Sequence, residues 1–573
     1  MPLSEEQELA IRKLALKNAL DYSKASAGAV LGKAVGLFPE LRKDMAALSG
    51  EVNRIVDSVN ALSADKLQQE FSPYAAEFEK EEKEKAARTS KPKFELPGAV
   101  AGAFATRFPP EPQGYMHMGH AKVAFMEREF ADMYKGKLFL YFDDTNPEHE
   151  RQEYVDAFKS DLRWLGIGYD AEYYASDNIE TMYGYARQLI NGGDAYVCVC
   201  DAETVKKNRF EGIECADRNN TQDTNLEMFE GMVKGDYKEE SAVLRFRVDM
   251  KSKNTALRDP TLMRIKNMPH YRQGTKYVLW PTYDMNTPIM DSLKGVTDAI
   301  RDKNYELRDE LNAMLVKKLK LRPVRIHSEA RTTIRGNMTS KRKIRALVSE
   351  GKVSGWDDPR LITIAALRRR GILPEAIKRF SLRFGMSKSN EEVGMDMLLA
   401  ENRKLVDKDA KRLFFIEDPV KVRISGFEKM HAKLKLHPQV QMGYREYDIG
   451  NVLYISGGDA MKLKAGDKVR LKDLLNIEVK DVGKDGISAQ YIGNENIDTD
   501  KIQWVDENNY EHGSIWRIGD LLKDEEFNAD SINIVNGYIE KYVSKLDESD
   551  VVNFERMGFY KLDNKDKLVF LEL

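Results

Sequence analysis

The sequence has few cysteines, no long apolar run and almost no net charge, and each shortage excludes a class of protein. Three cysteines among 573 residues exclude a disulfide-stabilised scaffold and fit a reducing compartment. No charge-free stretch approaches the roughly 18 apolar residues that a membrane helix needs, and the N-terminal segment lacks the pattern of a secretion signal. We therefore expect a cytoplasmic protein with no membrane partner.

The charged residues nearly cancel in number but are unevenly distributed. There are 90 Lys and Arg against 93 Asp and Glu, and on these totals alone nothing predicts a nucleic-acid partner. However, residues 331–383 contain fourteen Lys and Arg and only four acids, which leaves a local excess of ten positive charges. A basic face of this kind is expected where phosphates or a nucleic-acid backbone bind.

The residue pattern predicts a multidomain α/β and β protein, and 573 residues suggest about four domains. Residues 1–95 read as a helical N-terminal domain followed by a charge-dense linker or solvated helix at 79–93. Residues 96–325 alternate strands and helices, from a buried strand that starts near residue 98, as in a parallel sheet. Residues 326–405 are predicted as a helical connector, and 406–573 as short strands forming barrels or a sandwich.

The first motif, RFPPEPQGYMHMGH at residues 107–120, lies where the first predicted strand leads into a helix. A helix N-terminus offers free N–H groups and a positive dipole end, which suit phosphate. The imidazoles of His117 and His120 can stabilise charge on a transferred or departing phosphate, and Gly119 lets a nucleotide approach the backbone. A chance tetrapeptide or half a metal site would be the alternatives, but the Pro-rich frame after a buried strand disfavours both.

In this frame the sequence resembles the class I aminoacyl-tRNA synthetases, and more narrowly their glutamyl/glutaminyl branch. The resemblance implies a Rossmann-like catalytic domain in which an amino acid and ATP, with Mg²⁺, form an aminoacyl-adenylate and pyrophosphate. The amino acid is then esterified to the 3′ end of a tRNA. The same resemblance makes His117, Gly119 and His120 the first ATP-binding signature.

The branch also has a mobile lysine loop that grips the ATP phosphates, and two segments compete for this role. The letters MSKS at residues 386–389 are the better literal match. The letters MTSKRK at 338–343 precede the GWDDPR and LRRRG segments that follow the loop in the branch. We therefore assign the role to Ser340 and Lys341, with a solvated basic loop as the alternative, and interpret 386–389 as an accidental match.

The resemblance places four residues in the amino-acid pocket. Asp143 matches the residue that contacts the amino group, Tyr283 lines the pocket, and Arg107 contacts the substrate acid. Arg301 matches an arginine of the glutamyl enzymes, whose guanidinium can hold a γ-carboxylate through two parallel hydrogen bonds. A neutral amide would leave this cation underpaired. The alternatives are an Asx turn at Asp143, a core position for Tyr283 and a surface position for Arg301.

The tail refines the resemblance to the archaeal type of glutamyl-tRNA synthetase, since its β-rich sequence resembles anticodon-binding barrels and Arg301 is present. The implied activity is that of a glutamate–tRNA ligase that acts as a monomer on L-glutamate, ATP and tRNA(Glu). Use of tRNA(Gln) stays open. A glutaminyl enzyme and a non-catalytic tRNA-binding paralogue are the alternatives. The paralogue predicts loss of His117, His120 or Lys341, and all three are present.

All three cysteines fall in the expected acceptor-stem-binding insertion, at about residues 190–275. Cys198, Cys200 and Cys215 could hold structural Zn²⁺, which takes four ligands. Some relatives of archaeal type carry Cys or His two residues after the third cysteine, where this chain has Asp217. Because three thiolates and one carboxylate are an uncommon zinc set, metal-free thiols are the alternative.

Overall fold

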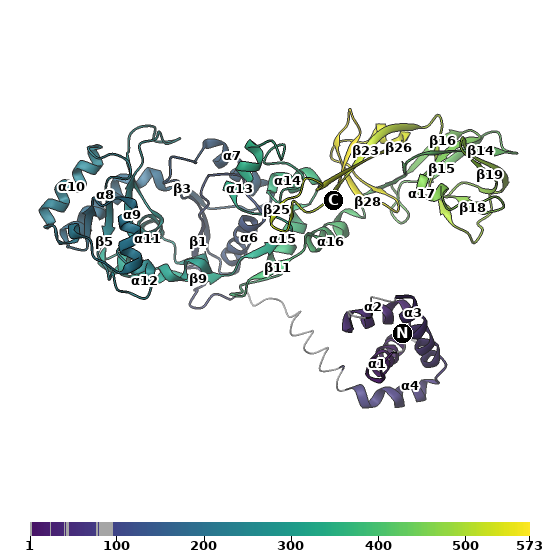
Figure 1. Ribbon diagram of the computed structural model, residues 1–573, viewed down its shortest axis with the longest axis horizontal. Helices are drawn as coiled ribbons and strands as arrows, with labels where there is room; N and C mark the ends of the chain where they lie inside the picture. Colours follow the sequence, from purple (N-terminus) through teal and green to yellow (C-terminus); the bar gives the residue numbers. More distant parts are fainter. Residues whose placement is uncertain (1–2, 23, 39–40, 42–44, 76–77, 79–94) are drawn as a thin grey trace. The chain divides into compact units, whose positions relative to one another are not determined.

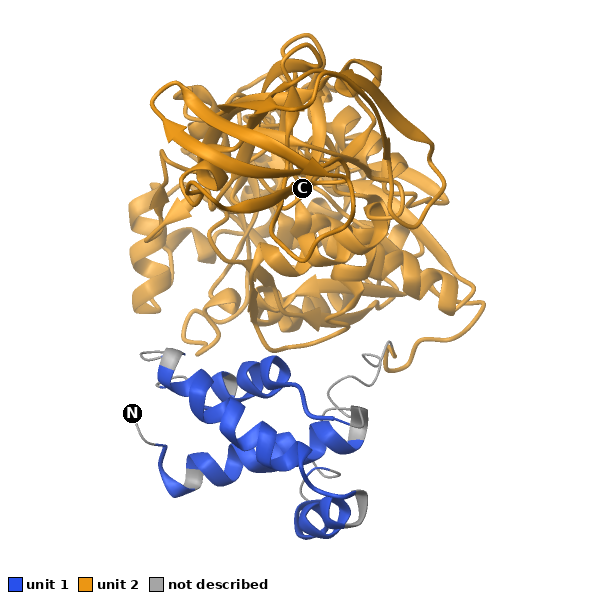
Figure 2. Cartoon of the chain, turned by 90° about the vertical axis from the view of Figure 1, so that its right-hand side faces the viewer, with its two compact units in different colours: residues 1–92 blue, residues 93–573 orange. Residues whose placement is uncertain are grey.

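The computed structural model covers residues 1–573 and describes all of them except 1–2, 23, 39–40, 42–44, 76–77 and 79–94. The contacts divide the chain into two compact units, Met1–Pro92 and Lys93–Leu573, which Figure 2 colours separately. The predicted linker at 79–93 lies outside the described residues. Among the described helices, none is long and apolar enough to span a bilayer.

The first unit is a helical bundle whose apolar residues recur at helical spacing. Ile11, Ala15 and Ala19 line one face of the first helix and are almost fully buried. They share a core with Val52 and Val59 from the third helix. Figure 1 labels the α-helices described for this unit: α1 (Glu5–Tyr22), α2 (Ala27–Leu37), α3 (Met45–Asn60) and α4 (Ala64–Phe71).

The second unit begins with a parallel sheet in the order β1-β2-β3, formed by β1 (Ala105–Phe108), β2 (Lys137–Phe142) and β3 (Ala171–Tyr174). The helices α6 (Met118–Met133) and α7 (Gln152–Trp164) connect these strands, as the alternating sequence pattern predicts. The first strand is shorter than predicted because Gly98 and Gly102 have φ angles of +79° and +78°, which belong to turns.

Two further strands, β8 (Asp298–Asp302) and β9 (Arg325–Glu329), form a parallel pair beside β1. The backbone N–H of Thr297 donates to the carbonyl of Ala105 at 2.8 Å, and the Arg107 side chain reaches the carbonyl of Ile300. The later residue of β1 contacts the later residue near β8, so the two strands run in the same direction. The side chains that follow β1, β2 and β8 therefore meet at one edge, where ligands of parallel sheets bind.

The insertion between β3 and β8 contains an antiparallel sheet in the order β4-β5-β6-β7. Its core is built around Trp280, Leu244 and Phe229, which are fully buried. The elements are α8 (Ile179–Asn191), β4 (Ala195–Cys198), α9 (Ala202–Glu211), α10 (Gln222–Lys234), β5 (Val243–Phe246), β6 (Thr261–Ile265), β7 (Leu279–Pro281), α11 (Tyr283–Leu293) and, after β8, α12 (Asp309–Lys318).

The connector is mainly helical and includes one short parallel strand pair, β10 with β11. Its helix α13 begins at Lys341, directly after the capping residue Ser340. The elements are β10 (Thr332–Ile334), α13 (Lys341–Ser349), α14 (Ile364–Arg370), α15 (Pro374–Leu382), β11 (Glu391–Val393) and α16 (Met395–Val406).

The C-terminal region contains two seven-stranded sheets, which confirm the predicted barrel-like β architecture. One has the order β12-β27-β28-β29-β23-β26-β13 and the other β21-β18-β19-β20-β14-β17-β22. The strands are β12 (Lys411–Leu413), β13 (Phe415–Glu417), β14 (Val420–Ser425), β15 (Met430–Lys435), β16 (Tyr444–Ile449), β17 (Val452–Ile455), β18 (Lys468–Leu471), β19 (Asn476–Gly483), β20 (Gly486–Gly493), β21 (Lys501–Ile502), β22 (Val505–Asp506), β23 (Tyr510–Ile518), β24 (Leu522–Lys523), β25 (Glu526–Phe527), β26 (Ile532–Glu540), β27 (Val551–Phe554), β28 (Gly558–Asn564) and β29 (Val569–Glu572), with a short helix α17 (Gly457–Ala460).

Candidate active site

Two stacked imidazoles form the N-terminal end of α6. The Nδ1 atom of His117 accepts hydrogen bonds from the backbone N–H of Gly119 at 3.1 Å and of His120 at 3.4 Å. The backbone N–H of His117 donates in return to Nδ1 of His120 at 3.3 Å, and the ring centroids lie 3.7 Å apart. Because both Nδ1 atoms accept, each neutral ring carries its proton on Nε2.

Both histidines are held in the neutral state. Burial, together with the positive charges of Lys341 and Arg331, lowers the pKa of His117 to about 3. Burial also lowers the pKa of His120 well below its usual range, with His117 and Lys341 acting in the same direction. At neutral pH the pair therefore offers two uncharged Nε2–H donors, fixed by backbone hydrogen bonds, to an incoming anion.

The predicted lysine lies beside these rings. Ser340 caps α13, and the Nζ atom of Lys341 donates to the backbone carbonyl of Glu111 at 2.8 Å. The same Nζ lies 5.5 Å from the centre of the Phe158 ring, which in turn contacts the His120 ring edge-on at 5.2 Å. Burial lowers the pKa of Lys341 to about 8, although the acid Glu111 opposes the shift. The amine is thus a partly desolvated cation close to both imidazoles.

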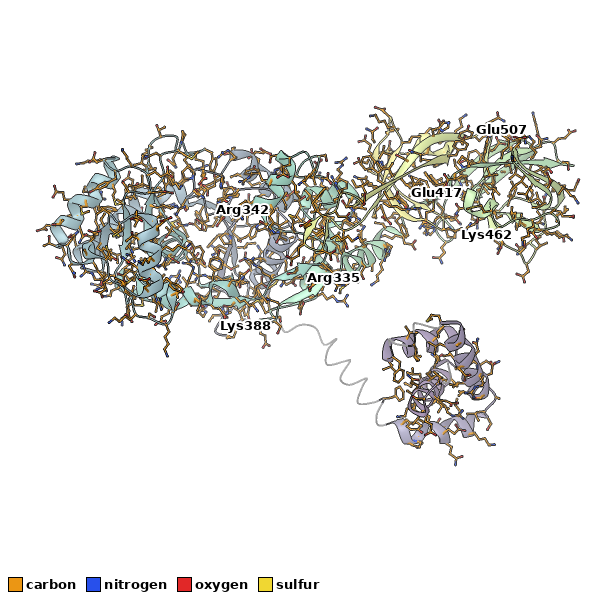
Figure 3. The ribbon with its side chains drawn as sticks, viewed as in Figure 1. Arg335, Arg342, Lys388, Glu417, Lys462 and Glu507 are labelled. Atoms are coloured by element: carbon orange, nitrogen blue, oxygen red, sulfur yellow. The ribbon has the colours of Figure 1, made fainter. Side chains whose placement is uncertain are left out.

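The competing lysine is placed elsewhere. Lys388 lies on the surface and pairs with Glu306 at 2.7 Å. Figure 3 shows Lys388 well apart from Arg342, the neighbour of Lys341. The fold therefore brings Lys341 to the first signature and leaves Lys388 away from it.

Two aspartates follow β2 and have different surroundings. Asp144 accepts hydrogen bonds from the backbone N–H and the hydroxyl of Ser176 and from the hydroxyl of Tyr271, at 2.7–2.9 Å. Asp143 accepts from the Nδ2 of Asn286 at 2.6 Å. Burial raises the pKa of each carboxyl to about 7. Asp144 is committed to the fold, which leaves Asp143 as the better partner for a substrate ammonium group.

The two predicted arginines converge on one carboxylate that sequence reasoning missed, Asp291. Arg107 is buried and donates to both oxygens of Asp291, from Nε at 3.0 Å and from Nη2 at 3.1 Å. It also donates from Nη1 to the carbonyl of Ile300. The Nη2 atom of Arg301 is 3.8 Å from Asp291. Arg107, which the resemblance assigns to the substrate acid, is thus already held by groups of the protein.

Arg301 is less well satisfied than Arg107. It is 6% exposed, and its Nε and Nη1 atoms are buried without a hydrogen-bond partner among the described residues. The Tyr283 ring lies 5.9 Å from the guanidinium carbon, and burial raises the pKa of Tyr283 to about 12. A buried cation with unused donors is costly unless an anion completes it. This corner of the site is therefore suited to a substrate carboxylate.

The residues that the sequence did not reveal lie on α11. Asn286 and Asp291 follow Tyr283 on the same helix, in which all residues from 284 to 292 are buried. Both are almost fully buried despite being polar. Polar residues inside a helix that is otherwise largely apolar are the signal that could have indicated them.

The three cysteines of the insertion lie close together in space. The Sγ of Cys215 is 3.5 Å from that of Cys198 and 3.3 Å from that of Cys200. The Asp217 carboxylate is 3.3 Å from Cys215, and all four ligand atoms lie within 4.8 Å of one another. Zinc with Zn–S bonds of about 2.3 Å spaces its tetrahedral ligands about 3.8 Å apart. The donor set and its spacing therefore fit a tetrahedral metal.

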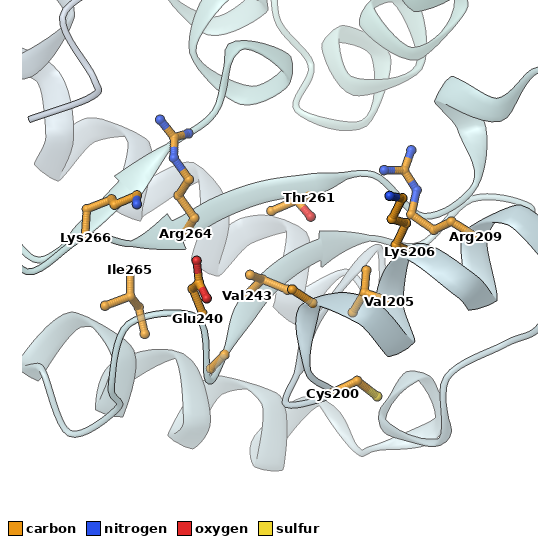
Figure 4. Close-up of a pocket in the computed structure, with 12 residues that line it drawn as sticks. Cys200, Val205, Lys206, Arg209, Glu240, Val243, Thr261, Arg264, Ile265 and Lys266 are labelled. Atoms are coloured by element: carbon orange, nitrogen blue, oxygen red, sulfur yellow. The ribbon is translucent and has the colours of Figure 1, made fainter. Parts of the chain in front are cut away.

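A cavity of about 380 Å³ lies next to this cluster, between α9 and the insertion sheet (Figure 4). Its walls include Cys200 and the acid Glu240. Four cations also line it: Lys206, Arg209, Arg264 and Lys266. The balance of charge favours an anionic ligand.

Comparison with known proteins agrees with this arrangement. Residues 103–408 match the catalytic domain of the tRNA synthetases class I (E and Q), and residues 410–493 and 501–563 match anti-codon binding domains of the same group. The chain belongs to this synthetase family. The reaction of this class I family depends on ATP and uses Mg²⁺. The matched catalytic and anti-codon binding domains also confirm the predicted fold class.

Curated relatives align with almost the whole chain. Proteins named glutamate–tRNA ligase from Nitrosopumilus maritimus and Pyrococcus furiosus are each 39% identical, over 99% of this chain and 100% and 99% of their own lengths. One from Cenarchaeum symbiosum is 37% identical over 98% of both chains. The similarity thus includes the helical N-terminal unit as well as the catalytic and anticodon-binding regions.

The environment of Asp143 predicts a pH dependence. Asp143 must be ionised to hold an ammonium group, so kcat/KM for the amino acid should fall as the pH drops through about 7. Asn286 stabilises the ionised form, and Asn286→Ala should therefore move this acid limb to higher pH, by about one unit. Ser176→Ala removes a donor from Asp144 instead and should leave the limb in place. Identical limbs in Asn286→Ala and the unaltered enzyme would contradict the assignment.

Proposed function

We propose that this chain is a glutamate–tRNA ligase that acts as a cytoplasmic monomer. It would join L-glutamate to ATP, release pyrophosphate, and transfer the glutamyl group to the 3′ end of tRNA(Glu). The observation that carries the specificity is Arg301, a buried guanidinium with unused donors at the end of β8. The names of the curated relatives support the same conclusion.

In the amino-acid pocket, charge decides which substrate fits. Asp143 accepts hydrogen bonds from the α-ammonium group, while Arg301, whose Nε and Nη1 have no partner among the described residues, donates to the γ-carboxylate. Tyr283 lies against the guanidinium and covers this corner of the site. Glutamine has nearly the same shape but brings no negative charge, so the excess cation would stay unpaired.

At the ATP end, the protein supplies donors and positive charge. The α-carboxylate oxygen of glutamate attacks the α-phosphorus, and the bond to the bridging oxygen breaks so that pyrophosphate leaves with the electron pair. His117 and His120 donate from Nε2 to phosphate oxygens, the α6 N-terminus at Gly119 adds its dipole, and Lys341 neutralises developing charge. Bound Mg²⁺ contributes further charge neutralisation at the phosphates.

In the second step, the terminal tRNA hydroxyl attacks the carbonyl carbon of glutamyl-adenylate, and AMP leaves as the ester forms. The basic excess over residues 331–383 attracts the tRNA backbone. The C-terminal sheets belong to matched anti-codon binding domains and would hold the other end of the tRNA. Separate charging of tRNA(Glu) and tRNA(Gln) with labelled glutamate determines whether both are substrates.

Substitution of Arg301 tests the specificity. Arg301→Ala should lower kcat/KM for glutamate by roughly 30- to several-thousand-fold, because a buried charge partner is lost. This factor corresponds to a loss of about 2 to 5 kcal/mol in transition-state stabilisation. The measurement is charging of tRNA(Glu) with labelled glutamate, with labelled glutamine assayed in parallel. Arg54→Ala, at an exposed arginine of the N-terminal helical unit, is the control and should behave like the unaltered enzyme. Unchanged glutamate use in Arg301→Ala would refute the specificity argument.

A matched pair of lysine variants tests the choice of signature loop. Lys341→Ala should slow ATP-dependent adenylate formation by about 100-fold or more, because a partly desolvated cation is lost at the phosphates. Lys388→Ala removes only a surface ion pair and should change the rate by less than about twofold. Pyrophosphate exchange measures this step directly. The reverse order of effects would show that residues 386–389 form the loop.

We also propose that Cys198, Cys200, Cys215 and Asp217 hold one structural Zn²⁺, supported by the spacing of their ligand atoms. The chain purified without chelators should contain about one zinc ion, and Cys200→Ser should lose most of it. Glu203→Gln, on the neighbouring α9, is the control and should retain the metal. Zinc quantification by mass spectrometry gives the readout, and a zinc-free unaltered chain would contradict the proposal.

A further inference from the structure

Arg245 is a fully buried arginine of the insertion that the proposed mechanism does not use. It lies on β5 directly opposite Tyr196 on β4, and its exposed fraction is 0%. Because side chains alternate along a strand, Cys198 lies on the same face of β4 as Tyr196 and diagonal to Arg245. The pairing of β4 with β5 therefore brings a buried guanidinium to the first of the three clustered cysteines.

The contacts of Arg245 are those of a cation that lacks an acid. Its Nε donates to the backbone carbonyl of Asp259 at 2.9 Å. Its Nη1 lies 4.0 Å from the Sγ of Cys198, and its Nη2 lies 3.7 Å from the Sδ of Met250. The centre of the Tyr196 ring is 5.6 Å from the guanidinium carbon. Within the described residues no ion pair joins Arg245 to a carboxylate, although a buried charge is costly without one.

The neighbouring acid Asp259 is engaged with other groups. Its carboxylate accepts hydrogen bonds from the Nε of Arg218 at 2.9 Å and from the backbone N–H of Val248 at 2.8 Å. Arg218 also pairs with Glu214 at 3.2 Å, so both of these acids are directed at that arginine. Asp259 therefore reaches Arg245 through its backbone carbonyl rather than through its carboxylate.

A metal-loaded cysteine cluster would supply the missing negative charge. Zinc takes cysteines as thiolates, so three thiolates and the Asp217 carboxylate around Zn²⁺ leave about two net negative charges. Cys198 and Cys215 are 0% and 3% exposed, so water compensates little of that charge. The thioether of Met250 cannot ionise, which leaves Cys198 as the sulfur that can balance Arg245. The buried cation and the cluster thus each lack what the other provides.

We propose that Arg245 is a positioning residue of the zinc site, which donates from Nη1 to the metal-bound sulfur of Cys198 and balances part of the site's negative charge. This inference rests on the proposed zinc site. Arg245 contacts a ligand rather than the metal, and groups in that position orient the ligand and change metal affinity by about 10- to 100-fold. Because the Asp259 carbonyl holds its Nε, the guanidinium is in place before the metal binds.

Zinc affinity of the full-length chain tests this role. R245M should fold, because Met has a similar length and leaves no unpaired charge in the core. It should nevertheless bind zinc at least about tenfold more weakly than the unaltered chain. R245K keeps the charge and should bind zinc more tightly than R245M. The measurement is competition for zinc with a chromophoric chelator of known affinity at fixed pH, and circular dichroism checks that each variant is folded.

Arg247→Met is the matched control. Arg247 lies two residues further along the chain, and its guanidinium carbon is 6.0 Å from the centre of the same Tyr196 ring. It donates to the backbone carbonyl of Arg218 and, among the described residues, has no hydrogen bond to sulfur. The control removes a positive charge from the same region without touching a ligand, so it should bind zinc within about twofold of the unaltered chain.

Cobalt substitution separates the effect of charge from a merely structural role. In the Co²⁺-loaded chain, the sulfur-to-cobalt charge-transfer band reports the energy of the thiolate electrons, which a neighbouring positive charge lowers. The band should therefore lie at longer wavelength in R245M than in the unaltered chain. R245K and R247M should keep it near its original position. A packing defect alone would weaken binding without this shift.

Unchanged zinc affinity, or an unshifted cobalt band, in folded R245M would overturn the proposal. If R245M does not fold, R245K decides, because its zinc affinity should stay within about tenfold of that of the unaltered chain. A larger loss in folded R245K would mean that the charge is not what the site requires. Failure of the zinc proposal looks different, because the unaltered chain itself would then take no zinc from the chelator.

Discussion

The buried ion pair between Arg107 and Asp291 is the interaction on which the site depends. It ties β1 to α11, and the bond from Arg107 to the Ile300 carbonyl adds β8. A buried pair repays its desolvation only when most of its donors and acceptors are bonded, and three guanidinium nitrogens are bonded here. Because α11 is fixed in this way, Tyr283 is held beside Arg301 and Asn286 is held against Asp143.

The start of α13 is held by a second constraint, which comes from the C-terminal region. The backbone N–H of Leu522, in the hairpin β24–β25, donates to the carbonyl of Gly336 at 2.9 Å. Leu521, which directly precedes β24, and Phe527 of β25 pack with Ile344 of α13. The helix α13, which begins at Lys341, therefore rests on the anticodon-binding region. Substitutions in this hairpin would act on the position of α13 rather than on the chemistry itself.

How far the sequence predicts the site depends on the range of the contacts. The helix α6, the strand β2 and the signature residues follow from local patterns, and the structure brings His117, His120 and Lys341 together. Asp291 and Asn286 escaped prediction because they act across 184 and 143 residues of sequence. A polar residue gives no local sign of a partner so distant. The strand β1 begins later in the structure than the sequence predicts, because the sequence pattern does not reveal the turns at Gly98 and Gly102.

Charge balance, more than shape, has to account for substrate choice in such a pocket. A carboxylate and an amide have almost the same size, so packing against Tyr283 cannot distinguish them. What differs is one unit of charge, and its effect is largest where Arg301 is shielded from water. Under the proposed function, Arg301 would supply the charge that a substrate carboxylate needs, because its Nε and Nη1 have no hydrogen-bond partner among the described residues.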